Sequence, residues 1–169
     1  SDADELDVYV TRIATATGIP AAHIEKDYWV TEVLRGISEA SRQSGCSIVF
    51  KGGTSLSKAH HLIQRFSEDL DLVAVLPAGG VKAKDAALKA FIAGAVASTG
   101  LKSETDRSAT TRGVKRTAVL SYPTAYGSGI LRPGVLIEVG TRGGALPQRR
   151  LAVQSLITEH AESIGLPVD

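Results

Sequence analysis

The amino-acid sequence predicts an α+β fold, with a small mixed sheet flanked by helices and preceded by a pair of N-terminal helices. Three observations support this prediction. Apolar residues recur at helical spacing over residues 4–17 and 20–43, short β-rich runs follow, and glycine-containing loops separate those runs. The chain has 169 residues, of which 43% are hydrophobic, so it can bury one ordinary core. We therefore expect a single domain over residues 1–169.

Turn residues set the expected order of the elements. Gly18-Ile19-Pro20 separates the two N-terminal helices and places proline in a first helical turn. Strands are then expected over residues 47–50, 69–76, 111–122 and 134–141, and helices over 55–63 and 81–98. Residues 151–164 fit either a strand or a helix. We divide the chain into a helical lead-in (1–45), a catalytic core (46–145) and the start of a C-terminal region that is cut short (146–169).

Composition limits the cellular compartments in which the protein is expected. Cys46 is the single cysteine, which excludes an internal disulfide framework, and no apolar run approaches the roughly 18 residues that a membrane span needs. The acidic N-terminus lacks the basic and apolar regions of a signal peptide. We therefore expect a soluble cytoplasmic protein without a membrane partner.

Charge is unevenly distributed along the chain. Residues 1–50 carry 4 basic and 8 acidic side chains, whereas residues 101–150 carry 9 basic and 3 acidic ones. The basic stretch is compatible with a surface that approaches phosphate groups. A solvated basic face with no partner is an equally open interpretation.

Gly52-Gly53-Thr54-Ser55 stands at a predicted junction of strand and helix. Adjacent glycines allow backbone torsions and close approaches that other residues resist, and the amides that open a helix point toward an anion. The segment therefore predicts a phosphate cradle, although two glycines alone usually mark only a turn.

Asp69 and Asp71 are one residue apart in a predicted strand, so their carboxylates project from the same face and can share a divalent cation. Phosphoryl transfer uses such an arrangement. Asp-x-Asp is also common at solvated strand edges. The functional interpretation therefore depends on the combination of glycine turn, helix and Asp-Leu-Asp strand in this order.

This combination resembles the nucleotidyltransferase superfamily, and it is most similar to the AbiEii/AbiGii-type toxins of bacterial abortive-infection and toxin–antitoxin systems. The residues that match the first motif of these toxins are Gly52, Gly53, Thr54, Leu56, Lys58, Arg65, Ser67, Asp69 and Asp71. Glu25-Lys26-Asp27-Tyr28 also looks like an upstream signature of the family. The resemblance covers residues 20–80 closely and residues 81–169 only by strand order.

The resemblance implies a nucleotidyltransferase fold and a third carboxylate on a later strand. Glu138 is the only acidic residue within a predicted later strand, so we assign Mg²⁺ or Mn²⁺ binding to Asp69, Asp71 and Glu138. An outward-facing strand glutamate is the alternative for Glu138.

The resemblance also places Lys58 and Arg65 beside the triphosphate, Lys58 as a catalytic residue, and Ser67 near the cradle as a hydroxyl ligand. For Arg65 the alternative is a structural ion pair with Glu68 or Asp27. A phosphate on Ser67 would add about two negative charges beside the cradle, which makes Ser67 a candidate regulatory phosphosite. A serine that only caps the turn is the alternative interpretation.

The implied function is that of a toxin that transfers nucleotides from an NTP to RNA, with the 3′ end of tRNA as the expected acceptor and a cognate antitoxin as the expected partner. The basic stretch from Lys102 to Arg150 would contact the RNA backbone. Two alternatives stay open: a catalytically inactive nucleotide- or partner-binding module, and a nucleotidyltransferase acting on a small molecule. Family members continue beyond this length, so we expect the activity of this chain to depend on further sequence.

Overall fold

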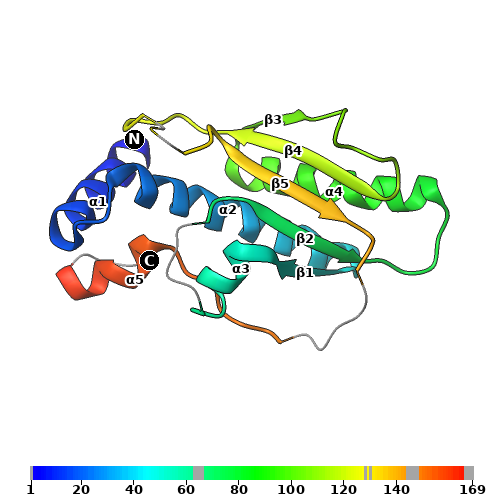
Figure 1. Ribbon diagram of the computed structural model, residues 1–169, viewed down its shortest axis with the longest axis horizontal. Helices are drawn as coiled ribbons and strands as arrows, with labels where there is room; N and C mark the ends of the chain where they lie inside the picture. Colours follow the sequence, from blue (N-terminus) through cyan, green and yellow to red (C-terminus); the bar gives the residue numbers. More distant parts are fainter. Residues whose placement is uncertain (1, 63–66, 128, 130, 144–148, 166–169) are drawn as a thin grey trace.

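The computed structural model describes residues 2–62, 67–127, 129, 131–143 and 149–165 (Figure 1). In chain order its elements are α1 (Asp2–Thr17), α2 (Ala21–Ser44), β1 (Ser47–Lys51), α3 (Gly52–Lys58), β2 (Leu70–Val75), α4 (Val81–Thr99), β3 (Lys102–Thr105), β4 (Lys115–Ser121), β5 (Val135–Gly140) and α5 (Leu156–Ala161), followed by a 3₁₀ turn at Glu162–Ile164.

The five strands form one mixed sheet in the order β1-β2-β5-β4-β3. β2 and β5 run parallel, whereas the other neighbouring strands are antiparallel. With two helices ahead of this sheet, the predicted α+β architecture is confirmed. The sheet is consistent with a nucleotidyltransferase-like fold.

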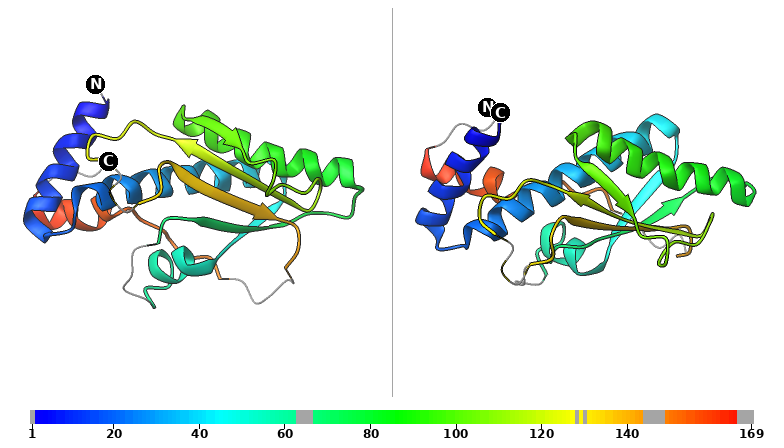
Figure 2. Two further views of the ribbon diagram at one scale, coloured as in Figure 1. Left: turned by 45° about the horizontal axis from the view of Figure 1, so that its top comes forward. Right: turned by 90° about the horizontal axis from the view of Figure 1, so that it is seen from above.

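α2 and α4 lie side by side along one face of the sheet (Figure 2). Their apolar residues share one core with the buried positions of β2, β4 and β5, such as Leu72, Leu120 and Ile137. Small residues bring the two helices close together, since a Cβ added at Gly94 would stand 2.4 Å from the Cβ of Ala40. The opposite face of the sheet has α3 beside β1 and β2.

A second, smaller apolar cluster joins the ends of the chain. Val10 and Ile13 of α1 pack with Ile24 at the start of α2 and with Leu156 and Ile157 of α5. α1 and α5 therefore cover the N-terminal part of α2 (Figure 1).

Three elements differ from the sequence-based expectation. α3 begins at Gly52 and ends at Lys58, because the two glycines open the helix instead of forming a separate turn before it. β4 begins at Lys115, because a tight turn closed by the Thr111–Lys115 bridge occupies the residues before it. β3 was not predicted, since a short, polar edge strand carries no apolar alternation.

Among the residues placed in the structure, no helix combines the length and the apolar character needed to cross a bilayer.

Candidate functional site

Asp71 and Glu138 lie side by side on neighbouring strands. They are register partners across the parallel pair β2 and β5, so both side chains project from the same face of the sheet. Leu70 and Leu72 point the other way, into the core beneath α2 and α4. The two carboxylates therefore face away from the core, and both are half-buried. The structure thus brings the sequence-predicted Glu138 next to Asp71.

Asp69 directly precedes β2 and is also half-buried. Its Oδ1 atom is buried and has no hydrogen-bond partner among the described residues. Burial raises the pKa of Asp69 above 3.8; Arg132 and Lys26 oppose the shift, while Glu68 and Asp71 add to it. A buried carboxylate oxygen without a donor is unusual in a folded protein and fits an atom that is available to bind a cation. We call Asp69, Asp71 and Glu138 the carboxylate face.

Gly52 is needed where α3 meets this face. Its φ is +78°, a conformation that favours glycine, and a Cβ at this position would stand 2.3 Å from Oδ2 of Asp71. Gly53 follows it in the first turn of α3. Gly52 therefore lets the backbone of α3 come into direct contact with the Asp71 carboxylate.

Hydroxyl groups of α3 hold the chain that leads into β2. Thr54 Oγ1 donates to the carbonyl oxygen of Asp69 at 2.5 Å and lies 2.8 Å from Oγ of Ser67. Ser55 Oγ donates to the carbonyl of Phe50 at 3.1 Å. Thr54 and Ser55 are buried. The Thr54 hydroxyl therefore positions the backbone at Asp69, whereas the Ser55 hydroxyl holds the end of β1. Their contact with a nucleotide stays a prediction.

Lys58 ends α3 and forms an ion pair with Oδ1 of Asp27 on α2. The other oxygen of Asp27 accepts a hydrogen bond from the Leu156 amide at the start of α5, at 2.7 Å. Arg65, for which an ion pair with Glu68 or Asp27 was the alternative to a place beside the triphosphate, lies outside the described residues. Lys58 is thus engaged by a carboxylate in the structure, and its contact with a triphosphate stays a prediction.

Glu25, Lys26 and Asp27 form a second group of charged residues, which we call the α2 charged cluster. All three are buried, and Lys26 is 0% exposed. The Lys26 ammonium donates to the carbonyls of Arg132 and Gly134 and lies 2.9 Å from Oε2 of Glu68.

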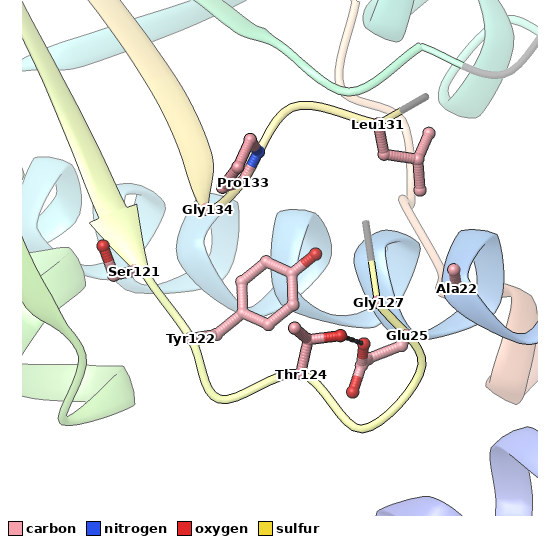
Figure 3. Close-up of a pocket in the computed structure, with 9 residues that line it drawn as sticks. All are labelled: Ala22, Glu25, Ser121, Tyr122, Thr124, Gly127, Leu131, Pro133 and Gly134. Carbon is pink, nitrogen blue, oxygen red and sulfur yellow. Dashed lines mark hydrogen bonds between the residues drawn. The ribbon is translucent and has the colours of Figure 1, made fainter. Parts of the chain in front are cut away.

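Glu25 accepts hydrogen bonds from the Thr124 hydroxyl at 2.6 Å and from the Ala125 amide at 3.1 Å. Figure 3 shows the first of these bonds beside a cavity of about 120 Å³, which none of the three carboxylates of the carboxylate face lines. The sequence marked Glu25 and its neighbours only as a family-like signature and gave no sign of these contacts.

Three residues of the basic stretch from Lys102 to Arg150 have different environments. Lys115 is 2.8 Å from Oε2 of Glu138, and Arg116 is 3.1 Å from Oδ1 of the buried Asp85. Arg132 has an exposed side chain, and its amide donates to Glu68 at 3.0 Å. Arg116 therefore supports the fold, whereas Lys115 and Arg132 lie close to the carboxylate face.

Comparison with known proteins identifies the family. The family model described as nucleotidyl transferase AbiEii toxin of type IV toxin–antitoxin systems matches residues 34–168. The chain belongs to this AbiEii family. The match includes the whole carboxylate face and continues well beyond residue 80, where the motif resemblance ended. No curated protein and no solved structure gave a significant match.

The AbiEii match assigns the chain to toxins that are nucleotidyl transferases, so a nucleotide substrate and an antitoxin partner belong to the family. The α2 charged cluster precedes the matched range, although Asp27 and Lys58 join it to the matched part. Within the residues that the structure describes, no three His, Cys, Asp or Glu side chains already surround a position for a metal ion. The carboxylate face offers suitable oxygen ligands without yet enclosing a cation.

Proposed function

We propose that this AbiEii-family chain is a metal-dependent nucleotidyltransferase that transfers a nucleotide from an NTP to an RNA hydroxyl, with the 3′ end of tRNA as the expected acceptor. One observation carries the proposal: Asp71 and Glu138 are register partners on parallel strands, and the nearby Asp69 has a buried oxygen with no partner among the residues that the structure describes. A purely structural carboxylate would have donors for that oxygen.

Asp69, Asp71 and Glu138 would hold Mg²⁺ or Mn²⁺. Carboxylate oxygens are the ligands that these hard cations prefer, and the buried oxygen of Asp69 fits that need. When bound, the cation would supply charge stabilisation to the triphosphate and to the attacking hydroxyl.

The protein's own residues would position the reactants. Gly52 lets α3 approach the Asp71 carboxylate, and Thr54 holds the Asp69 backbone, so the cradle and the carboxylates keep a constant separation. Arg132 would donate to phosphate oxygens, because its charge acts on Asp69 and its backbone is held by Glu68 and Lys26.

In the proposed reaction the acceptor hydroxyl oxygen attacks the α-phosphorus of the NTP. A new P–O bond forms and the hydroxyl proton is released to solvent. The bond between the α-phosphorus and the bridging oxygen breaks, and its electron pair leaves with pyrophosphate. The basic residues between Lys102 and Arg150 support an RNA acceptor over a small one, since RNA binding draws on cationic contacts to the backbone. Such a substrate would place the protein in the cytoplasm, beside its cognate antitoxin.

Incubation of the protein with each α-³²P-labelled NTP, Mg²⁺ and total RNA tests the proposal. We expect label in RNA, and we expect Asp71→Ala and Glu138→Gln each to lower transfer at least 100-fold while the protein stays folded. Glu104→Gln is the matched control, because Glu104 is an exposed carboxylate on the edge strand β3 and should leave transfer unchanged.

Three other results would contradict the proposal. Label in small molecules and none in RNA would favour a small-molecule nucleotidyltransferase. NTP binding without transfer to either acceptor would favour an inactive binding module. Full transfer by Asp71→Ala would remove the carboxylate face from the mechanism.

A further inference from the structure

Lys115 is the one residue of the basic stretch that forms an ion pair with the carboxylate face in the described part of the chain. Its ammonium nitrogen lies 2.8 Å from Oε2 of Glu138, the position expected for a metal ligand. Lys115 opens β4, which is the antiparallel neighbour of β5. A lysine so close to a predicted cation ligand competes with the cation for the same oxygen.

The register of the sheet makes this contact a property of the fold. Glu138 is paired with Thr117, and Lys115 is two residues before Thr117, so all three side chains project from the same face. Asp71 projects from this face too, because it is the register partner of Glu138 on β2, the other neighbour of β5. Lys115 therefore extends along β4 toward the row of carboxylates.

The exposure of the pair allows the two side chains to separate. The side chain of Lys115 is 40% exposed and that of Glu138 is 35% exposed, so both have water on one side. Ion pairs of this exposure are weak and exchange readily with other partners. By contrast, the Lys58–Asp27 pair, with both side chains below one tenth exposed, has no comparable freedom.

We propose that Lys115 is the internal counter-ion of the carboxylate face. Its ammonium holds Glu138 in the metal-free protein, leaves Glu138 when a divalent cation binds, and then donates to a phosphate of the bound NTP. The inference rests on the proposed function, since it names the residue that couples the metal to the triphosphate.

Two consequences distinguish this role from that of an RNA contact. Without nucleotide, loss of Lys115 removes a cation that competes with the metal for Glu138, so the metal should bind more tightly. With metal present, loss of Lys115 removes a charge-assisted donor to the triphosphate, so the nucleotide should bind more weakly. An ordinary ligand or a structural residue would change both affinities in the same direction.

Titration of nucleotide-free protein with Mn²⁺, followed by the electron paramagnetic resonance signal of free Mn²⁺, measures the first effect. We expect Lys115→Gln to bind Mn²⁺ about three- to tenfold more tightly than the wild type. The second effect is measured with the α,β-methylene analogues of the four NTPs, tested singly in saturating Mg²⁺, and we expect Lys115→Gln to bind the preferred analogue about tenfold more weakly.

Lys89→Gln is the matched control. Lys89 also pairs with a carboxylate, Asp85 at 3.2 Å, but it belongs to α4 on the other face of the sheet. We expect this variant to leave both affinities unchanged. We also expect Glu138→Gln to weaken Mn²⁺ binding, and the addition of Lys115→Gln to that variant to cause no further change, because Lys115 acts through Glu138.

Tighter Mn²⁺ binding by Lys115→Gln that disappears in the Glu138→Gln background supports the inference. Unchanged or weaker Mn²⁺ binding by Lys115→Gln overturns it, while wild-type Mn²⁺ binding and nucleotide transfer would leave the proposed function standing. If neither the wild type nor Lys115→Gln binds Mn²⁺, the inference and the metal-dependent function fail together.

Discussion

The α2 charged cluster and the carboxylate face each bring three charged side chains together, but the two groups differ in how far these side chains are paired. Glu25, Lys26 and Asp27 are buried, and each has partners that the structure identifies. The carboxylates of the face are half-buried. Within the described part of the chain, Asp69 has an oxygen without a donor and Glu138 pairs with a half-exposed lysine.

The difference separates a scaffold from a site. Consecutive residues of a helix point about 100° apart, so the three neighbours of the α2 charged cluster reach three different parts of the chain. Glu25 holds the segment after β4, Lys26 holds the entry to β5, and Asp27 joins α3 to α5. The side chains of the α2 charged cluster already have hydrogen-bond and ion-pair partners and are therefore structural. The carboxylate face has incompletely paired oxygens, so it can bind a ligand.

The largest effect on stability is expected at Lys26. Lys26→Met removes a fully buried ammonium, and with it the ion pair with Glu68 and the hydrogen bonds to two carbonyls, which should lower the free energy of unfolding by about 3–5 kcal/mol. Urea denaturation measures this loss. Lys102→Met on the exposed edge strand β3 is the control, and a loss below about 1 kcal/mol at Lys26 would contradict the scaffold role.

Asp85 is a buried carboxylate with several hydrogen-bond donors, so it tests whether such donors let a carboxylate stabilise the fold. Burial alone would raise the pKa of Asp85, but hydrogen bonds from Lys89, Arg116 and the Gly113 amide outweigh it and hold the pKa below 3.8. Since the folded-state pKa is depressed, this contribution to stability is present above pH 3.8 and is lost as the pH falls through the folded-state pKa.

We therefore expect Asp85→Asn to lower the free energy of unfolding by about 1–3 kcal/mol at pH 7. Denaturation at a series of pH values should show the difference from the wild type shrinking below pH 3.8. A difference that stays constant across this range would show that Asp85 acts through its shape and not through its charge.

Ser67 should have a smaller effect on stability. Ser67→Ala removes one hydroxyl contact, at 2.8 Å from Thr54, and should cost about 0.5–1.5 kcal/mol while nucleotide transfer is largely retained. A phosphate on Ser67 would instead bring about two negative charges beside Asp69 and the cradle, and we expect it to block NTP binding. Transfer by protein phosphorylated at Ser67 that equals the unmodified rate would remove Ser67 as a regulatory site.

The smallest effect on stability is expected at Asp69, despite its place in the proposed mechanism. Burial disfavours the charged form, as the raised pKa of Asp69 shows, so Asp69→Asn should leave the melting temperature unchanged or slightly higher at neutral pH. Mn²⁺ binding should be lost in the same variant. A clear fall in melting temperature would place Asp69 with the scaffold and not with the site.

The sequence by itself determined the features that depend on local pattern. Helical spacing located α2 and α4, and the alternation after residue 69 located β2, which contains Asp71 and directly follows Asp69. The glycine pair that opens α3 was recognised for its backbone freedom, which the φ of Gly52 bears out. Each of these features depends on residues that are close together in the sequence.

Only the tertiary structure decided which distant residues meet. The sequence proposed Glu138 as a third carboxylate, and the parallel register of β2 and β5 places it beside Asp71. The pairing of Asp27 with Lys58, of Glu138 with Lys115 and of Arg116 with Asp85 could not be read from the spacing of charges. The sequence does not show whether a charged residue will be buried or which residue it will pair with, because strand register and helix packing determine both.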